Sequence, residues 1–338
     1  MDTCSEQHVI CLDMGTTNTR VWLLCGDEVL AHSTRPIGVR LTATEGSTGR
    51  LAAALREMVA EVTSKAGEAH QPKCIGAAGM ITSDLGLKEI PHVVAPAGLK
   101  EIVSSSQWHH FREITELPFL LVPGIRTTRN DSTEDVMRGE ETLCLGLITS
   151  RVLSLPGVVL NLGSHWKAIE VDSSGRICSS VTSLSGELID AARTQTVLAS
   201  SLPKEFPNEL PWKWAEAGMI ECRQAGLPRT LFRVRLLELQ NEGTAEERLA
   251  FLVGAFIACD LDALLAQGIF VDKQVVLSGR LAITECWKRA LQQMSVHASG
   301  LNADDTERAF LKGLQQVMNR VQSYKGIQKA QLTSTTTF

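Results

Sequence analysis

The segment from Ile10 to Arg20, ICLDMGTTNTR, constrains the fold of this chain more than any other stretch. A short apolar run ends in Asp13, a glycine-containing polar turn follows at Gly15 to Thr19, and a second apolar run begins directly after it. Both runs have the length and composition of buried strands. The polar turn therefore leads into a strand. This excludes the P-loop and the dinucleotide-binding βαβ unit, in which the phosphate turn opens a helix.

The residues of this turn suit a phosphate group. Gly15 permits a tight turn, while Thr16, Thr17 and Asn18 offer backbone N–H groups and side-chain donors to phosphate oxygens. Asp13 would lie beside a bound triphosphate, where its expected role is to hold Mg²⁺ through the water ligands of the metal. The alternative is an ordinary hairpin turn whose side chains only satisfy nearby backbone groups. The surrounding order of strands favours the phosphate site.

The same order of elements occurs twice along the chain. Glu28 to Ser33 continues the first meander, and apolar spacing predicts a helix over residues 49–66. A strand, a glycine turn and two further strands recur between residues 157 and 180. We therefore expect an α/β chain with two domains, residues 1–126 and 127–338, each with a mixed five-stranded sheet, and a cleft between them. The last helix is expected either to stay in the second domain or to pack back on the first.

The second half contains weaker nucleotide signals. Gly163 and Ser164 stand at the place in the second meander that the first phosphate turn holds in the first. Gly279 lies in a turn between a predicted strand, Gln274 to Leu277, and a predicted helix, where a nucleobase and ribose would bind near the helix N-terminus. Glycine turns at such junctions are common, so these signals gain weight only together with the first turn. They predict a second phosphate turn and an adenosine site.

A cluster of carboxylates lies at the expected domain boundary, in the segment EDVMRGEET from Glu134 to Thr142. Transfer of a phosphoryl group to a hydroxyl needs a carboxylate that orients the alcohol and accepts its proton. Asp135, predicted as the N-cap of a helix, and Glu140, predicted inside that helix, are both candidates. Acidic residues in a first helical turn also occur for capping alone, so this alternative stays open.

Four residues are candidate contacts to an anionic substrate. Arg126 and Arg138 are candidates for a substrate carboxylate, because a guanidinium binds a planar anion through two hydrogen bonds. Lys167, beside the second turn, would act as a point charge. Ser83 lies in a polar loop after residue 80, and loops of this kind often bind substrates.

Composition narrows the classes of partner and compartment. The net charge of -5 provides no basic footprint for nucleic acid or an anionic membrane. No uninterrupted apolar run is long enough to predict a membrane span, and the N-terminus has no signal-peptide pattern. The nine cysteines form no CxxC pair, and the apolar surroundings of Cys11, Cys144 and Cys259 predict buried free thiols. A cytoplasmic protein is expected.

Together these segments resemble the 2-dehydro-3-deoxygalactonokinase family of the sugar kinase, Hsp70 and actin superfamily. The resemblance implies two actin-like (ribonuclease H-like) domains and phosphorylation of the terminal hydroxyl of 2-dehydro-3-deoxy-D-galactonate to the 6-phosphate by ATP and Mg²⁺, in galactonate breakdown. The partner is then a small sugar acid, and a homodimer is left open. The segments that carry the resemblance are Asp13 to Arg20, Gly79 to Met80, Ala95 to Ala97, Val122 to Gly124, Asp135 to Thr142, Gly163 to His165, Thr182 to Ser183, Gly186 to Leu188 and Ala309 to Leu314.

Several positions depart from the family pattern, among them Ser164 in the second turn, where threonine is common, and the loop from Ile81 to Ile90. Met14 stands where the family usually has tryptophan, and Trp166 stands where a small polar residue is usual. We expect these departures to bear on substrate identity more than on the kinase reaction. The alternatives are a kinase of the same fold for another sugar or sugar acid, and a non-catalytic regulator that binds a nucleotide or a sugar acid.

Overall fold

The computed structural model describes residues 8–129 and 133–334 of the 338-residue chain. By its internal contacts the chain divides into two compact units. Unit 1 comprises the residues up to 150 together with those from 308 on, and unit 2 comprises residues 151–307. The division comes later in the chain than the expected boundary at residue 126, and the last helix returns to unit 1.

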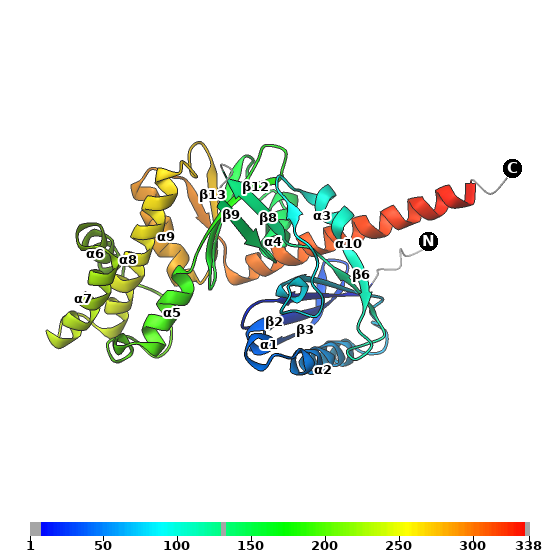
Figure 1. Ribbon diagram of the computed structural model, residues 1–338, viewed down its shortest axis with the longest axis horizontal. Helices are drawn as coiled ribbons and strands as arrows, with labels where there is room; N and C mark the ends of the chain where they lie inside the picture. Colours follow the sequence, from blue (N-terminus) through cyan, green and yellow to red (C-terminus); the bar gives the residue numbers. More distant parts are fainter. Residues whose placement is uncertain (1–7, 130–132, 335–338) are drawn as a thin grey trace. The chain divides into compact units, whose positions relative to one another are not determined.

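Unit 1 is built on a six-stranded mixed sheet in the order β3-β2-β1-β4-β7-β6. Figure 1 labels β2, β3 and β6 of this sheet. β1 pairs antiparallel with β2 and parallel with β4. The expectation of five strands is wrong here by one strand, because the polar segment QWHH adds to the edge of the sheet beside β7. The strands are β1 (His8–Met14), β2 (Thr19–Cys25), β3 (Glu28–Arg35), β4 (Ile75–Gly79), β6 (Gln107–His110) and β7 (Pro118–Leu121).

Helices pack on both faces of this sheet. The predicted helix over residues 49–66 is confirmed as α2, whose apolar stripe joins the core on one face. On the other face α10 packs from Arg308 on, with Met318 against Gly76 of β4 and the Phe310 ring 6.1 Å from the Trp22 ring. The helices are α1 (Val39–Glu45), α2 (Gly49–Ala66), the 3-10 turn η1 (Met80–Thr82), α3 (Leu99–Ser105), α4 (Glu140–Thr149) and α10 (Ala303–Ser334).

A small three-stranded sheet precedes α4. It contains β5 (Val93–Val94), β8 (Ile125–Arg129) and β9 (Thr133–Met137), in the order β5-β8-β9. The prediction of Asp135 as the N-cap of a helix is therefore wrong, because Asp135 lies inside β9 and the N-cap of α4 is Gly139. The threonine and valine residues of these segments favour extended backbone over helix.

Unit 2 has the expected five-stranded mixed sheet, in the order β12-β11-β10-β13-β14. Its strands are β10 (Gly157–Leu162), β11 (Trp166–Val171), β12 (Ile177–Ser183), β13 (Gln274–Gly279) and β14 (Ala298–Gly300). Its helices are α5 (Ser185–Gln195), the 3-10 turn η2 (Val197–Ser200), α6 (Trp212–Ala225), α7 (Leu227–Leu239), α8 (Ala245–Ala266) and α9 (Leu281–Gln293). Figure 1 shows these helices gathered beside the sheet of this unit.

Helix α8 is the apolar centre of unit 2. By length and composition alone it is long enough to cross a membrane, but 67% of its most apolar window is buried within the protein. The backbones of α8 and its neighbour α6 are in direct contact. Gly218 of α6 lies against the carbonyl of Phe251, and Gly254 of α8 lies against the carbonyl of Ala215. These contacts are those of a core helix in a folded domain, and they account for its apolar sequence.

The described cysteines are free thiols. Cys11 and Cys144 are buried, as expected, whereas Cys259 is exposed. The expectation for Cys259 is wrong, because its apolar neighbours in sequence, such as Ile257 and Ala258, are buried while Cys259 itself is not. Its sulfur atom lies 3.4 Å from the sulfur of Cys222 on α6.

Candidate active site

The first predicted phosphate turn, residues 15–18, is held by the N-terminus of α1. The N–H of Val39 donates to the carbonyl of Gly15 (3.3 Å), and the N–H of Arg40 donates to the carbonyl of Thr16 (2.9 Å). The N–H and C=O groups of a trans peptide point in opposite directions. The amide groups that follow these two carbonyls therefore point away from α1. Such a row of N–H groups is what an anion requires.

The turn is closed by its own residues. Gly15 N–H donates to the carbonyl of Asn18 (2.8 Å), and the side chain of Asn18 donates to the hydroxyl of Thr17 (3.0 Å). Thr16 and Thr17 are half-buried, and Asn18 is exposed. The structure thus places the predicted residues Gly15, Thr16, Thr17 and Asn18 in one turn, at the carboxyl end of β1.

Asp13 lies where three backbone segments of unit 1 meet. Its carboxylate forms an ion pair with Arg20 across the hairpin (2.7 Å). A Cβ placed on Gly79, at the end of β4, would lie 3.2 Å from Oδ1 of Asp13, and one placed on Gly139 would lie 3.9 Å from the same atom. Burial raises the pKa of Asp13, Arg20 opposes this shift, and the nearby charge of Glu140 adds to it. The ends of β1 and β4 and the start of α4 therefore form one polar site.

The start of α4 brings two carboxylates to this site. Glu140 is the first residue of the helix, and its Oε2 accepts a hydrogen bond from the N–H of Arg138 (3.2 Å). Glu141 is fully buried, and its two carboxylate oxygens accept the N–H of Gly139 at 3.0 and 2.8 Å. Burial, with a smaller contribution from Glu140, raises the pKa of Glu141 to about 7. The sequence did not predict a role for Glu141, although it stands directly beside the candidate base Glu140.

Arg138 fixes the loop that follows β4. Its Nη1 donates to the hydroxyl of Thr82 (3.0 Å) and to the carbonyl of Ile90 (3.1 Å). Burial lowers the pKa of Arg138, and Glu141 opposes this shift. Ser83 is buried in the same loop and donates its hydroxyl to the carbonyl of Met80 (2.7 Å). Both predicted substrate residues thus bond within the protein, and their contact with substrate stays a prediction.

Asp135 and Arg126 lie on the three-stranded sheet, on opposite faces. Asp135 is paired with Thr127, whereas Arg126 is paired with Val136, and successive residues of a strand point to opposite sides. Arg126 and Val136 are exposed, while Thr127 is buried. Oδ1 of Asp135 accepts the N–H of its neighbour Val136 (2.8 Å). The sheet therefore does not bring these two predicted residues together.

Unit 2 repeats the construction of the first turn. The N–H of Glu187, in the first turn of α5, donates to the carbonyl of Ser164 (2.7 Å). A Cβ on Gly186 would overlap the carbonyl oxygen of Gly163, so the helix approaches this turn as closely as backbone allows. Ser164 is exposed. The turn carbonyls again face a helix N-terminus, and the amide group of the following residue points away from it.

The predicted adenosine residue lies beside this second turn. Gly279 ends β13 opposite Leu162 of β10, with a backbone φ of 141° that favours glycine. This pairing matches that of Gly79 with Met14 in unit 1. A hollow of about 270 Å³ at this end of the sheet is lined by Leu162, Gly163, Ser164, Gly186, Ile189, Asp190, Phe206, Gly279, Arg280 and Ile283. Three predicted residues, Gly163, Ser164 and Gly279, thus meet at one hollow.

The wall of the hollow has an aromatic and cationic part that sequence reasoning missed. The guanidinium of Arg280 lies 4.7 Å from the centre of the Phe206 ring, and that of Arg193 lies 5.4 Å from it. Ligands of open α/β sheets bind outside the carboxyl ends of the strands, which is where this hollow lies. No sequence motif marks Phe206, because it comes from a loop far from the strands.

Three residues singled out in the sequence, Lys167, Met14 and Trp166, are buried, and two of them belong to unit cores. Lys167 is 5% exposed on β11, between Asn161 and Thr182 of the neighbouring strands, and it does not line the hollow. Met14 belongs to the core of unit 1. Trp166 is buried in unit 2, with its ring 5.6 Å from that of Trp287. Met14 and Trp166 therefore affect packing, and neither side chain lines the hollow.

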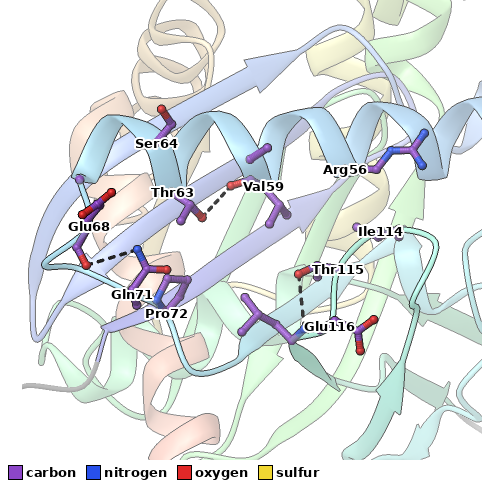
Figure 2. A pocket seen from close by; sticks show the side chains of 13 residues that line it. Arg56, Val59, Thr63, Ser64, Glu68, Gln71, Pro72, Ile114, Thr115 and Glu116 are labelled. Carbon is purple, nitrogen blue, oxygen red and sulfur yellow. Dashed lines mark hydrogen bonds between the residues drawn. The ribbon is translucent and has the colours of Figure 1, made fainter.

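A second hollow, of about 620 Å³, lies elsewhere in unit 1 (Figure 2). It is lined by the C-terminal half of α2, the segment 67–72 that precedes β4 and the segment 114–117 that precedes β7. It thus lies at the amino ends of β4 and β7, whereas Asp13 and Gly79 lie at the carboxyl ends of their strands. We assign it no part in the chemistry.

Comparison with known proteins identifies the family of this chain. A family model described as 2-keto-3-deoxy-galactonokinase matches residues 13–317. The 2-dehydro-3-deoxygalactonokinase of Escherichia coli (strain K12) is 28% identical over 321 residues, 92% of this chain and 98% of that protein.

Two solved structures are similar over nearly the full length. A candidate 2-dehydro-3-deoxygalactonokinase from Sinorhizobium meliloti has a TM-score of 0.72 at 24% identity and covers 93% of this chain and 99% of its own. The activator of 2-hydroxyisocaproyl-CoA dehydratase from Clostridium difficile, solved with bound ADPNP, has a TM-score of 0.53 at 14% identity and covers 95% and 98%. These similarities concern the fold, and they confirm the predicted actin-like α/β architecture.

Proposed function

Because this chain belongs to the 2-keto-3-deoxy-galactonokinase family, we propose that it phosphorylates the terminal hydroxyl of 2-dehydro-3-deoxy-D-galactonate with ATP, giving the 6-phosphate. The observation that carries the proposal is the family match from Asp13 to Val317, which spans both phosphate turns and the start of α4. The activity would belong to galactonate breakdown in the cytoplasm.

The residues of unit 1 fit Mg²⁺ that is held largely through water. Asp13 is a half-buried carboxylate, and Glu140 is near enough for its charge to raise the pKa of Asp13. Among the described residues, no group of three or more His, Cys, Asp or Glu is placed to enclose a metal ion. Mg²⁺ commonly keeps several waters and binds one or two carboxylates together with substrate phosphates. When bound, ATP and Mg²⁺ supply the phosphoryl group and neutralise its charge.

We assign the role of general base to Glu140. Its place as the first residue of α4 puts it in the site of Asp13 and Gly79, whereas Asp135 lies in β9 with its carboxylate bonded to its own strand. Glu140 would accept the proton of the substrate hydroxyl as the new bond from that oxygen to the γ-phosphorus forms and the bond from the γ-phosphorus to the leaving ADP breaks. Glu141, bonded to the N–H of Gly139, holds the backbone that carries Glu140.

The two turns would bind phosphate oxygens through backbone N–H groups and the hydroxyls of Thr16, Thr17 and Ser164. The hollow at Gly279 would take the adenosine, with the Phe206 ring in its wall. Among the substrate candidates, Arg126 has an exposed side chain on β8, while Arg138 already donates to the loop after β4. We therefore propose Arg126 for the substrate carboxylate and Arg138 for the shape of the loop. Ser83 and Lys167 remain proposed substrate contacts.

The test is an ADP-release assay over a panel of 2-keto-3-deoxy sugar acids. We expect turnover with 2-dehydro-3-deoxy-D-galactonate and a lower kcat/KM for its gluconate epimer. The reverse preference would overturn only the substrate assignment and support a kinase of the same fold for another sugar acid. Binding of ATP with no turnover of any acid would reject the enzyme and support a non-catalytic regulator.

A further inference from the structure

A carboxylate on the core helix of unit 2 is bonded to the start of α5. Oδ2 of Asp260, on α8, accepts hydrogen bonds from the hydroxyls of Ser183 (2.6 Å) and Ser185 (2.8 Å). Ser183 is the last residue of β12, and Ser185 is the first residue of α5. Burial raises the pKa of Asp260, and the two serine hydroxyls oppose this shift by binding the charged form. The carboxylate thus fixes the link between β12 and α5.

The first turn of α5 in turn supports the second phosphate turn. The N–H of Glu187 donates to the carbonyl of Ser164. Gly186 lies so close to the carbonyl oxygen of Gly163 that a side chain at position 186 would overlap it. A shift or rotation of this end of α5 would therefore move the turn. A continuous series of hydrogen bonds and covalent links therefore connects Asp260, through Ser185 and the first turn of α5, to Ser164, and all of these residues belong to unit 2.

We propose that Asp260 is a positioning residue for ATP: by holding Ser183 and Ser185, it keeps α5 where α5 orients the Gly163–Ser164 turn for phosphate. The inference rests on the proposed function, because it takes this turn to be an ATP phosphate site. Asp260 does not line the hollow and is not proposed to touch the nucleotide.

The experiment compares Asp260→Ala, Asp260→Asn and a matched control, Asp262→Ala. Asp262 lies on the same helix, and its side chain is 48% exposed in an ion pair with Arg223 (2.7 Å). For Asp260→Ala we expect the Kd and KM for ATP to rise about tenfold, while kcat and the KM for the sugar acid stay within about twofold. Asn keeps an acceptor oxygen for a serine hydroxyl, so Asp260→Asn should recover most of the affinity. The control should bind ATP as the unchanged protein does.

A double-mutant cycle separates positioning from a general loss of stability. Ser183→Ala with Ser185→Ala should weaken ATP binding as Asp260→Ala does, and adding Asp260→Ala to that pair should have little further effect. If Asp260→Ala does not fold, the serine variants and Asp260→Asn test the same contacts. An unchanged Kd for ATP in folded Asp260→Ala, or in the paired serine variant, would overturn the proposal.

Calorimetric titration with ATP keeps this test apart from the test of the proposed function. If the unchanged protein binds ATP but turns over no sugar acid, the proposed activity fails while the effect of Asp260 on the Kd is still measured. If turnover is normal and the Asp260 variants bind ATP as the unchanged protein does, only the positioning role fails.

Discussion

Two neighbouring carboxylates at the start of α4 have different surroundings, and this difference assigns them different roles. Glu140 is half-buried and lies near Asp13, whereas Glu141 is fully buried and bonded to the backbone of Gly139. A general base must reach the substrate, and a carboxylate enclosed by its own backbone cannot. We therefore propose Glu140 as the base and Glu141 as the residue that holds it in place.

The first prediction concerns the choice of base. Glu140→Gln should lower kcat by about a hundredfold or more, because the amide cannot accept the proton of the substrate hydroxyl. Asp135→Asn should change kcat by only about a few fold, because Asp135 lies in β9 with its carboxylate bonded to Val136. Steady-state kinetics with saturating ATP would measure both. Equal and mild losses would reject Glu140 as the base, and a larger loss for Asp135→Asn would assign the role to that residue.

The second prediction concerns the pH dependence of stability at Glu141. Its pKa is raised from 4.5 to about 7 in the folded protein, so the folded state binds the proton more tightly than the unfolded chain does. The free energy of unfolding should therefore fall as the pH rises from about 4.5 to about 7, by up to about 3 kcal/mol, and level off above. Below 4.5 this stabilisation is fully present.

Thermal melts at pH 5 and pH 8 would measure this effect. The Tm of the unchanged protein should fall relative to that of Glu141→Gln between these two values, because glutamine has no proton to lose. Glu116→Gln is the matched control, since the Glu116 side chain is 86% exposed, and its Tm should follow the unchanged protein. A constant difference between Glu141→Gln and the unchanged protein would show that Glu141 does not titrate in this range.

The residues of the site were predictable to different degrees. Asp13, the first turn and the Gly163–Ser164 turn have local signatures, because a glycine and hydroxyl turn after a strand is encoded in adjacent residues. Glu141 has no such signature. In sequence it resembles a surface helix residue, and its burial arises only because α4 packs within unit 1. Long-range packing, which the sequence pattern does not contain, gives Glu141 its raised pKa.

At the scale of elements, periodic segments were predicted well and polar strands were not. The helix over residues 49–66 agrees with α2 because its apolar residues recur at helical spacing along its whole length. The expected domain boundary between residues 126 and 127 falls inside β8, and β9 follows it. These strands form a small sheet with β5, whose pairing joins segments about 30 residues apart.

The third prediction concerns the packing of α4 on α10 in unit 1. A Cβ on Gly146 of α4 would overlap the carbonyl of Ala309, so Gly146→Ala must push two helices apart. We expect a loss of about 1–3 kcal/mol, seen as a lower Tm. Gly49→Ala is the matched control at the start of α2, where the nearest atom would be Ser47 Oγ at 3.5 Å. The control should be neutral or stabilising, because alanine favours helix more than glycine does. Equal Tm values for the two variants would show that α10 does not pack closely on α4.

At the scale of the whole molecule, the two units share one plan that individual residues do not reveal. In each unit a hairpin turn ends the central strand, a helix N-terminus binds the turn carbonyls, and a glycine at the end of the next parallel strand pairs with the turn. The pairs are Met14 with Gly79 and Leu162 with Gly279. The order of strands predicted this repeat. The six strands of unit 1 and its completion by α10 depend on contacts between distant segments.

The last prediction tests that completion of unit 1 by the end of the chain. From Arg308 on, α10 packs on the sheet of unit 1 through Met318 at Gly76 and Phe310 beside Trp22. A chain that ends after Glu307 would expose this apolar face of the sheet, so we expect it to aggregate or to melt at a much lower temperature. Co-expression of residues 308–338 as a separate segment should restore part of the soluble yield. Lys312→Ala is the control, because it removes only an ion pair with Asp27 at the surface (2.8 Å) and should leave the Tm almost unchanged. A truncated chain that stays soluble with the Tm of the full chain would show that unit 1 folds without α10.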